Sequence, residues 1–106
     1  MPTISWSRAL NSERTKMYYV YVIQNERSAI YVGYTRKLDQ RIDSHNRGET
    51  RSTRGHQWRI VYFEAYLSEA DARDREKKLK QRGQAKRFLK ERIAHSLEVP
   101  FELSAR

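Results

Sequence analysis

The sequence predicts an α/β fold: a small, mainly antiparallel three-stranded sheet flanked by helices, in the order β-β-α-β-α-α. Short runs of aromatic and β-branched residues, typical of strands, alternate with longer segments whose apolar residues recur every three or four positions. A length of 106 residues favours a single domain. Twelve aromatic residues argue against disorder, although 33% of the chain is charged.

The first two strands are expected at residues 18–24 and 30–34, joined by a short polar connection that predicts an antiparallel hairpin. Gly33 marks a close backbone approach or a bend in the second strand. A third strand is expected at 58–67. Strict alternation would place Val61, Phe63, Ala65 and Leu67 on one face, and Trp58, Ile60, Tyr62 and Tyr66 on the other.

The first helix is expected to follow Thr35 as its N-cap and to stop at Gly48. The second begins after Ser68, which has a carboxylate three residues later, and ends near Gly83. The third spans about 84–96, with Ala85, Phe88, Leu89 and Ile93 on its apolar face.

Around this core we expect a flexible N-terminal arm over 1–16, a domain over 17–97 and a C-terminal tail over 98–106. No apolar run approaches the roughly 20 residues that span a membrane, and residues 1–16 do not resemble a secretory signal. The chain contains no cysteine, which excludes disulfides, thiol chemistry and cysteine metal sites. We therefore expect a cytoplasmic protein that does not associate with membranes.

The net charge of +9 and the pI near 10.1 point to an anionic partner. Residues 36–59 hold seven basic and three acidic residues, and residues 73–92 hold ten basic and three acidic ones. Two basic clusters on a nearly neutral frame favour nucleic acid over a membrane surface or an acidic protein. A basic protein with no nucleic-acid partner is the alternative at this point.

Few features of the sequence could carry chemistry. Tyr21 and Tyr31 lie on the two strands of the predicted hairpin, where most tyrosines serve only for packing. Arg41 and His45 are four residues apart, so they share one face of a helix and could reach a phosphate together. The alternative for this pair is a solvated polar edge.

Glu76 stands among basic residues of the second helix. A single carboxylate can hold Mg²⁺ when waters and phosphate oxygens complete the shell. It can equally form an (i, i+4)-type ion pair, here with Arg73 or Lys80.

Taken in order, these residues resemble the GIY-YIG nuclease superfamily, and most closely its short, single-domain bacterial branch. The two signature triplets read Tyr19-Val20-Tyr21 and Tyr31-Val32-Gly33. Arg41 and His45 match the Arg and His of the following helix, and Glu76 matches the metal-binding Glu. One departure is Tyr19, which stands where the first triplet begins with Gly.

The resemblance implies a DNA endonuclease of repair or processing that hydrolyses phosphodiester bonds with Mg²⁺ (or Mn²⁺). Glu76 would hold the ion, and Arg41 would stabilise charge on a non-bridging phosphate oxygen. Tyr21 would accept a proton from the attacking water, and Tyr31 would hydrogen-bond the phosphate or that water. His45 is either a rival base or the group that polarises Tyr21.

We expect DNA contacts from six basic residues of the two clusters: Arg36, Lys37, Arg51, Arg54, Lys77 and Lys80. The competing function is a non-catalytic DNA- or RNA-binding module, including an RNA- or ribosome-associated factor. In that case the helices at 69–81 and 84–96 would form a basic binding pair.

Overall fold

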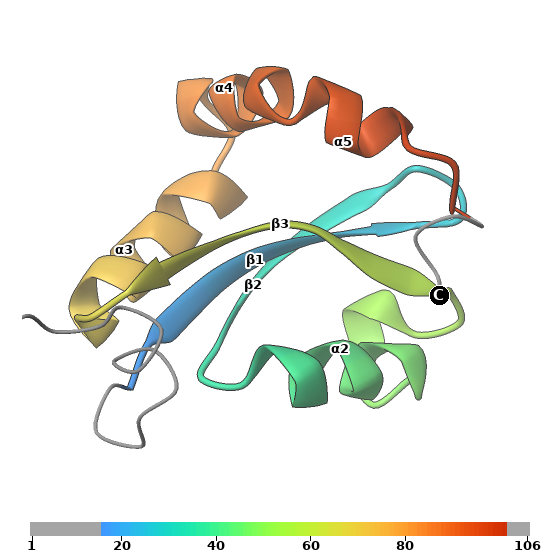
Figure 1. Ribbon diagram of the computed structural model, residues 1–106, viewed down its shortest axis with the longest axis horizontal. Coiled ribbons are helices and arrows are strands. Elements are labelled where there is room, and N and C mark those ends of the chain that lie inside the picture. Colours follow the sequence, from blue (N-terminus) through green and yellow to red (C-terminus); the bar gives the residue numbers. More distant parts are fainter. Residues whose placement is uncertain (1–15, 102–106) are drawn as a thin grey trace, which may run out of the picture.

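The computed structural model describes residues 16–101 (Figure 1). The predicted arm, apart from Lys16, and the last five residues of the predicted tail lie outside this range. The elements, labelled as in Figure 1, are β1 (Tyr18–Asn25), β2 (Ile30–Thr35), α2 (Leu38–Asn46), the 3-10 helix η1 (Arg51–Thr53), β3 (Trp58–Tyr66), α3 (Glu69–Lys80), α4 (Gln84–Arg92) and α5 (Ala94–Glu98). The predicted α/β class and the predicted element order are confirmed.

The sheet has the strand order β2-β1-β3, and both pairings are antiparallel. The predicted hairpin of β1 and β2 is therefore confirmed. Tyr21 lies at the centre of the sheet, opposite Gly33 on β2 and opposite Phe63 on β3. This register brings the two signature triplets side by side.

One expectation for β3 is wrong. The β1–β3 register shifts between Val22, which pairs with Tyr62, and Ile23, which pairs with Ile60. The extra residue reverses the alternation. Ile60 and Trp58 therefore pack with Tyr21 on one face, while Tyr62 and Tyr66 pack on the other.

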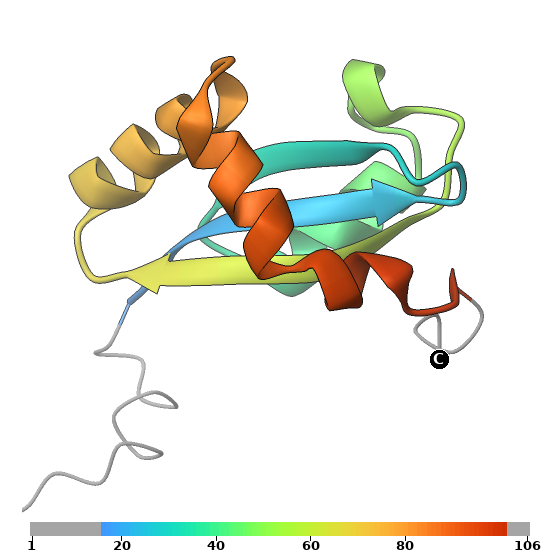
Figure 2. The ribbon, with the colours of Figure 1, turned by 90° about the horizontal axis from the view of Figure 1, so that it is seen from above.

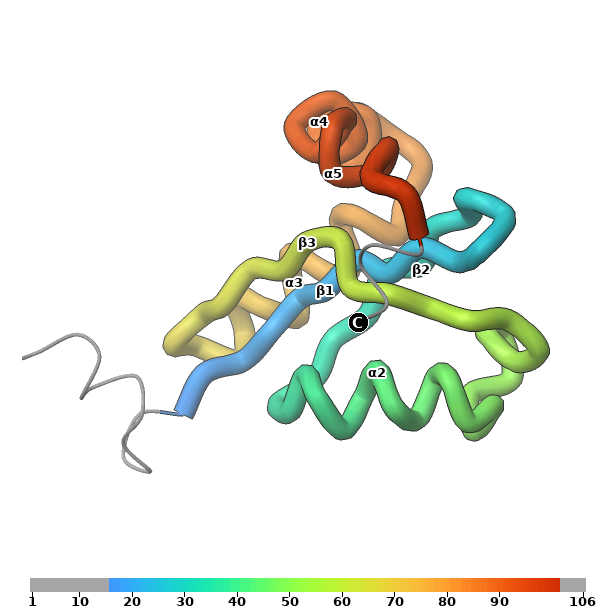
Figure 3. Tube along the Cα trace, turned by 45° about the vertical axis from the view of Figure 1, so that its right-hand side comes forward, coloured from blue at the N-terminus to red at the C-terminus, as the bar shows by residue number. Residues whose placement is uncertain are grey.

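Helices cover both faces of the sheet. Figures 1 and 3 show α2 on one face and α4 with α5 on the other. Figure 2 shows α3 and η1 beyond the β2 edge, at opposite ends of that strand. The main core lies on the α3 and α4 side, around Val20, Val22, Val32, Ala72, Leu79, Leu89 and Ile93. A smaller core of Tyr21, Ile23 and Trp58 lies under α2.

The helix ends differ from the predictions in three places. Thr35 is not an N-cap, because it ends β2 and its hydroxyl accepts a bond from the Lys37 N–H at 3.1 Å. Lys37 is the residue that precedes α2. Gly83, with φ of 157°, precedes α4 and does not directly follow α3, which ends at Lys80. The predicted third helix is divided at Ile93 into α4 and α5.

Ser68 does precede α3, as predicted, but its side chain makes no capping hydrogen bond. Within residues 16–101, no helix combines the length and the apolar character needed to cross a membrane.

Candidate active site

Tyr21 reaches its position because Gly33 lacks a side chain. The two residues are paired across β1 and β2, and the Tyr21 ring crosses the β2 backbone at Gly33. A Cβ built on Gly33 would collide with the Tyr21 hydroxyl and ring. The close approach predicted for Gly33 is therefore confirmed, and its partner is the tyrosine ring.

His45 lies at the end of α2 and is the only buried residue of that helix. Its side chain has no solvent exposure, and Tyr21 is only 1% exposed. The Tyr21 Oη lies 2.7 Å from Nε2 of His45, and the two rings meet edge to face. The Tyr31 ring packs against the other side of this pair, 5.3 Å from the imidazole centroid.

Thr53 of η1 completes the contacts of His45, and the sequence analysis does not identify it. Its Oγ1 lies 2.7 Å from Nδ1 of His45 and 3.3 Å from the Thr50 carbonyl. The Thr53 carbonyl accepts a bond from the Trp58 indole at 2.7 Å, and Thr53 is fully buried. The only sequence signal was an uncharged residue between Arg51 and Arg54, which is too weak to single it out.

These contacts determine which atom donates and which atom accepts in each hydrogen bond of His45. The Thr50 carbonyl can only accept, so the Thr53 hydroxyl donates to it and accepts from Nδ1–H of His45. The Nε2 of His45 then carries the lone pair, and the Tyr21 hydroxyl donates to it. The imidazole is held as the tautomer that can take a proton from Tyr21.

Arg41 lies one helical turn before His45 on α2 and donates from Nε to Tyr21 Oη at 3.3 Å. Burial raises the pKa of Tyr21 above its ordinary value, and Arg41 opposes this rise. Burial, together with the charge of Arg41, lowers the pKa of His45 to about 4. At neutral pH, Tyr21 therefore keeps its proton and His45 is uncharged.

Glu76 lies on α3, close enough to raise the pKa of Tyr21 slightly through its charge. Its Oε2 is 3.2 Å from Nζ of Lys80, and its side chain is 18% exposed. Lys80 also lies over the Tyr31 ring, 5.1 Å from the centroid. Of the two ion pairs considered for Glu76, the structure forms the one with Lys80, whereas Arg73 pairs with Glu69.

The donor set suits a hard divalent cation held by few protein ligands. No three His, Cys, Asp or Glu side chains gather at one point within residues 16–101, so no multi-ligand metal cage is present there. Glu76 offers one carboxylate of low exposure, whose charge acts on Tyr21 and whose ion-pair partner Lys80 lies over the Tyr31 ring. That fits Mg²⁺ or Mn²⁺, which commonly use one or two carboxylates with waters and phosphate oxygens.

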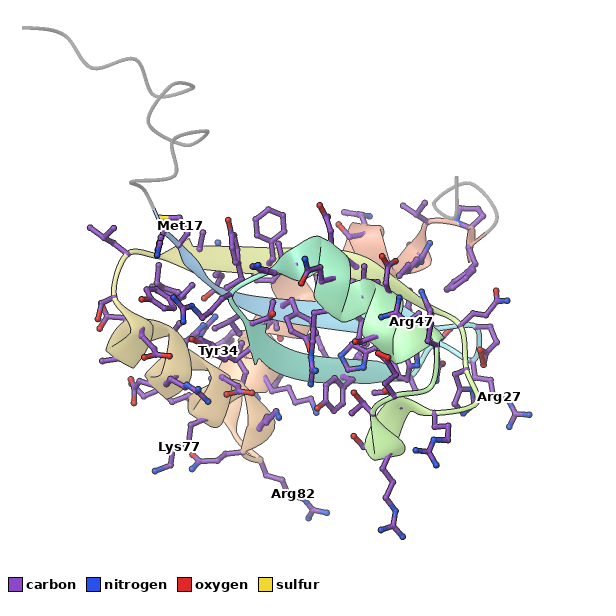
Figure 4. The ribbon with its side chains drawn as sticks, turned by 90° about the horizontal axis from the view of Figure 1, so that it is seen from below. Met17, Arg27, Tyr34, Arg47, Lys77 and Arg82 are labelled. Carbon is purple, nitrogen blue, oxygen red and sulfur yellow. The ribbon has the colours of Figure 1, made fainter. Side chains whose placement is uncertain are left out.

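The six predicted DNA-contacting residues are all exposed and lie on three segments. Arg36 and Lys37 join β2 to α2, Arg51 and Arg54 belong to or follow η1, and Lys77 and Lys80 project from α3. Figure 4 shows Lys77 and Arg82 extending from the α3 side of the β2 edge. The Arg54 guanidinium also donates to the Gly48 carbonyl at 2.9 Å, which ties this segment to the end of α2.

A cleft of about 1130 Å³ opens beside two of these residues, Arg36 and Lys37. Four of its ten lining residues are basic: Lys16, Arg36, Lys37 and Arg41. None of these ten described residues is acidic. Figure 4 shows Met17 and Tyr34, which also line the cleft, at the end of the sheet where α2 begins. Because Arg41 lines the cleft and bonds Tyr21, the cleft leads to the buried cluster.

The tyrosine, histidine and arginine cluster lies on a small three-stranded antiparallel sheet, and comparison with known families identifies the class of this domain. The profile of the GIY-YIG catalytic domain matches residues 17–89. The chain therefore belongs to the GIY-YIG nuclease superfamily, whose members generally depend on a divalent metal. The resemblance drawn from the two triplets, Arg41, His45 and Glu76 is confirmed.

Within the superfamily, the chain is similar to short UPF0213 proteins of bacteria and archaea. A UPF0213 protein of Clostridium perfringens is 37% identical over 62 residues, which are 57% of this chain and 67% of that protein. A second, from Pediococcus pentosaceus, is 34% identical over 79 residues, 69% of this chain and 81% of that protein. The solution NMR structure of a UPF0213 protein from Bacillus halodurans matches with 31% identity and a TM-score of 0.46, covering 81% of this chain and 90% of that chain.

Proposed function

We propose that this protein is a divalent-metal-dependent endonuclease that hydrolyses phosphodiester bonds in DNA and acts in DNA repair or processing in the cytoplasm. The observation that carries the proposal is the directed hydrogen-bond chain from Arg41 through Tyr21 and His45 to Thr53. Such a chain, in which every proton has one direction, is what a proton acceptor for an attacking water requires.

The proton path runs from water to Tyr21 and then to His45. The attacking water gives a proton to Tyr21 Oη as Tyr21 passes its own proton to Nε2 of His45. The water oxygen forms a bond to phosphorus, and the bond from phosphorus to the leaving oxygen breaks. The leaving oxygen departs with the electron pair of that bond and takes a proton from the solvent. Thr53 accepts from Nδ1–H throughout, so the imidazolium that forms keeps a partner on that side.

This path assigns the two candidate bases different roles. A free phenol has a pKa near 10, and burial raises the pKa of Tyr21 further, so Tyr21 cannot act as a standing phenolate. His45 is neutral with its lone pair aimed at Tyr21. We therefore assign Tyr21 as the group that contacts water and His45 as the acceptor behind it.

Arg41 has two roles in the proposal. In the free protein its Nε–H covers the Tyr21 oxygen, which is otherwise almost fully buried. A bound phosphate would draw the guanidinium away and leave the Tyr21 oxygen open to water. Because the charge of Arg41 helps to lower the pKa of His45, pairing Arg41 with phosphate would also make His45 a stronger base.

Glu76 would hold the divalent ion, and Tyr31 would hydrogen-bond the phosphate. The ion supplies Lewis-acid stabilisation of the phosphate and the leaving oxygen when it is bound. Lys80 would then exchange its ion pair with Glu76 for a DNA phosphate. The other five predicted contact residues, Arg36, Lys37, Arg51, Arg54 and Lys77, would bind neighbouring phosphates along the strand.

The metal assignment is tested with Glu76→Gln and a matched control on the same helix. Asp74 forms an equivalent (i, i+4) pair with Lys78, and its side chain is 62% exposed. We expect Glu76→Gln to abolish cleavage of supercoiled, linear, single-stranded and branched DNA in Mg²⁺. DNA binding should be equal or stronger, because a negative charge is removed from a basic surface.

Asp74→Asn removes the same charge at a comparable position and should cleave as the natural protein does. Cleavage by Glu76→Gln at the rate of the natural protein would refute the metal assignment. DNA binding with no cleavage in Mg²⁺ or Mn²⁺ by the unaltered protein would instead support the non-catalytic binding module.

A further inference from the structure

The cleft that leads to Arg41 has an aromatic wall that the proposed chemistry does not use. Tyr19 lines this cleft, and its side chain is partly exposed. Tyr19 and Tyr21 alternate with Val20 on β1, so both side chains start from the α2 face, and their Cα atoms are roughly 7 Å apart along the strand. Tyr19 therefore shares a sheet face with Tyr21, two residues away on β1, at the position where the family triplet begins with Gly.

The Tyr19 ring has a fixed aromatic neighbour. Phe63 of β3 meets it edge to face, with ring centroids 5.9 Å apart and an interplanar angle of 67°. Phe63 is 51% exposed and lies on the edge strand β3, where it is paired with the buried Tyr21. The short helix α2 covers Ile23, Tyr31 and Trp58 and leaves this aromatic pair accessible.

The charge of the cleft identifies the kind of ligand. Four basic side chains and an aromatic ring in one cleft are the combination that binds single-stranded nucleic acid, in which cations hold the phosphates and rings stack on the bases. A paired base cannot supply a free face for stacking, whereas an unpaired base can.

We propose that Tyr19, supported by Phe63, is a stacking site for an unpaired base next to the phosphate held by Arg41. The preferred substrate is then DNA that is single-stranded or locally unpaired at the cut. This inference rests on the proposed function for the identity of the phosphate, but the base site can be tested without cleavage.

The test is equilibrium binding by fluorescence anisotropy in the presence of a chelator. The probes are a short oligothymidylate, a strand of the same length with abasic spacers in place of all nucleotides, and a duplex. The first two carry the same phosphates and differ only in their bases. We expect the full-length protein to bind oligothymidylate roughly 5- to 150-fold more tightly than the abasic strand, the usual value of one stacked base.

Four variants assign this preference to the ring. Tyr19→Leu should bind both strands with the affinity that the natural protein has for the abasic strand, whereas Tyr19→Phe should keep the preference. Phe63→Leu should weaken the preference and provides a second test if Tyr19→Leu does not fold. Phe88→Ala is the control, because Phe88 is also 51% exposed but lies on α4.

Equal binding of the two strands by the natural protein overturns the proposal, as does a preference retained in both Tyr19→Leu and Phe63→Leu. Tighter binding of both strands by Tyr19→Leu also overturns it, because the ring would then hinder the binding of a strand. Base-dependent binding without metal-dependent cleavage would refute the nuclease but leave the base site standing. Cleavage without base-dependent binding would refute the base site alone.

Discussion

Tyr21 combines three contacts: its ring lies over the backbone of Gly33, its hydroxyl hydrogen-bonds to His45, and its oxygen accepts a hydrogen bond from Arg41. The hydroxyl, and not the ring, is the part assigned to chemistry. Phenylalanine at this position keeps the packing and removes only that group. Removing the hydroxyl oxygen alone can therefore distinguish a catalytic role of Tyr21 from a purely structural one.

We expect Tyr21→Phe to lower turnover roughly 10²- to 10⁴-fold, the usual contribution of positioned acid–base catalysis. Steady-state cleavage assays in Mg²⁺ measure the loss, and circular dichroism checks the fold. Tyr18→Phe, on the opposite face of β1, is the control and should keep full activity. Normal turnover in Tyr21→Phe would assign the ring to packing and leave His45 to activate the water directly.

In the proposed reaction, Thr53 would act only through its contact with His45, as a positioning residue. Thr53→Val removes the acceptor for Nδ1–H of His45, so the imidazole should no longer be held in one tautomer. We expect kcat to fall about 10- to 100-fold, the usual cost of losing a group that orients a histidine ligand. Because no phosphate contact is lost, KM should stay unchanged. Thr53→Ser restores the hydroxyl and should recover most of the activity.

Nitrogen-15 NMR of the imidazole gives a readout independent of activity. His45 should show protonated Nδ1 in the natural protein and in Thr53→Ser, and a mixture of tautomers in Thr53→Val. An Nε2-protonated imidazole in the natural protein would contradict the proposed direction of proton transfer.

At the scale of elements, the helices and the pairing of β1 with β2 were predictable, because both depend on local patterns in the sequence. Alternating β-branched and aromatic residues identified β1 and β2, and the short polar connection fixed their antiparallel pairing. The bulge near Ile60 was not predictable, because it depends on which residue of β3 the partner strand selects. The face assigned to Trp58 was wrong for this reason.

The residues of the candidate site that are brought together by their spacing in the sequence were predictable. Those brought together by tertiary contacts were not. Arg41 and His45 share a helix face through their spacing, and the two triplets align through the hairpin. Thr53 is eight residues from His45 and joins it only because η1 folds back onto α2 under the Trp58 indole. No local pattern in the sequence indicates that contact.

The end of α2 also determines how the stability of the protein responds to acid. The pKa of His45 is about 4 in the folded protein and near 6.5 when unfolded, so only the unfolded chain gains this proton between those values. The contribution of His45 to stability is complete above pH 6.5. It declines as pH falls toward 4, with a total loss of roughly 3 kcal/mol.

Urea unfolding between pH 7 and 4 measures this effect against His45→Gln, which cannot titrate. The free energy of unfolding should fall more steeply for the natural protein than for the variant. Parallel curves for the two proteins would show that His45 titrates alike in the folded and unfolded states. Other groups that titrate in this range affect both proteins and cancel in the comparison.

At the scale of the whole molecule, the chain carries a net charge of +9. The six predicted DNA-contacting residues are exposed and lie on the connection from β2 to α2, at η1 and on α3. Figure 2 shows η1 and α3 beyond the β2 edge. A single strand or a duplex that follows this edge would release counterions from its phosphates. The affinity should therefore depend strongly on salt.

If about five phosphates of duplex DNA are contacted, the logarithm of the binding constant should fall against the logarithm of salt concentration with a slope near −4.5. Anisotropy titrations across a range of KCl concentrations give this slope. Lys77→Ala, on the exposed surface of α3, should reduce it by about one, and the same change at Lys90 on α4 should not. A slope near zero would exclude phosphate binding as the source of affinity.

The crossing of the Tyr21 ring over the β2 backbone also limits which substitutions this domain can accept in evolution. Position 33 holds no reactive group, yet in a saturation-mutagenesis experiment it should tolerate as few replacements as Tyr21, because every side chain begins with the Cβ that meets the ring. Tolerance should return only together with a smaller residue at position 21. Glycine at position 33 and tyrosine at position 21 are thus expected to be inherited as a pair.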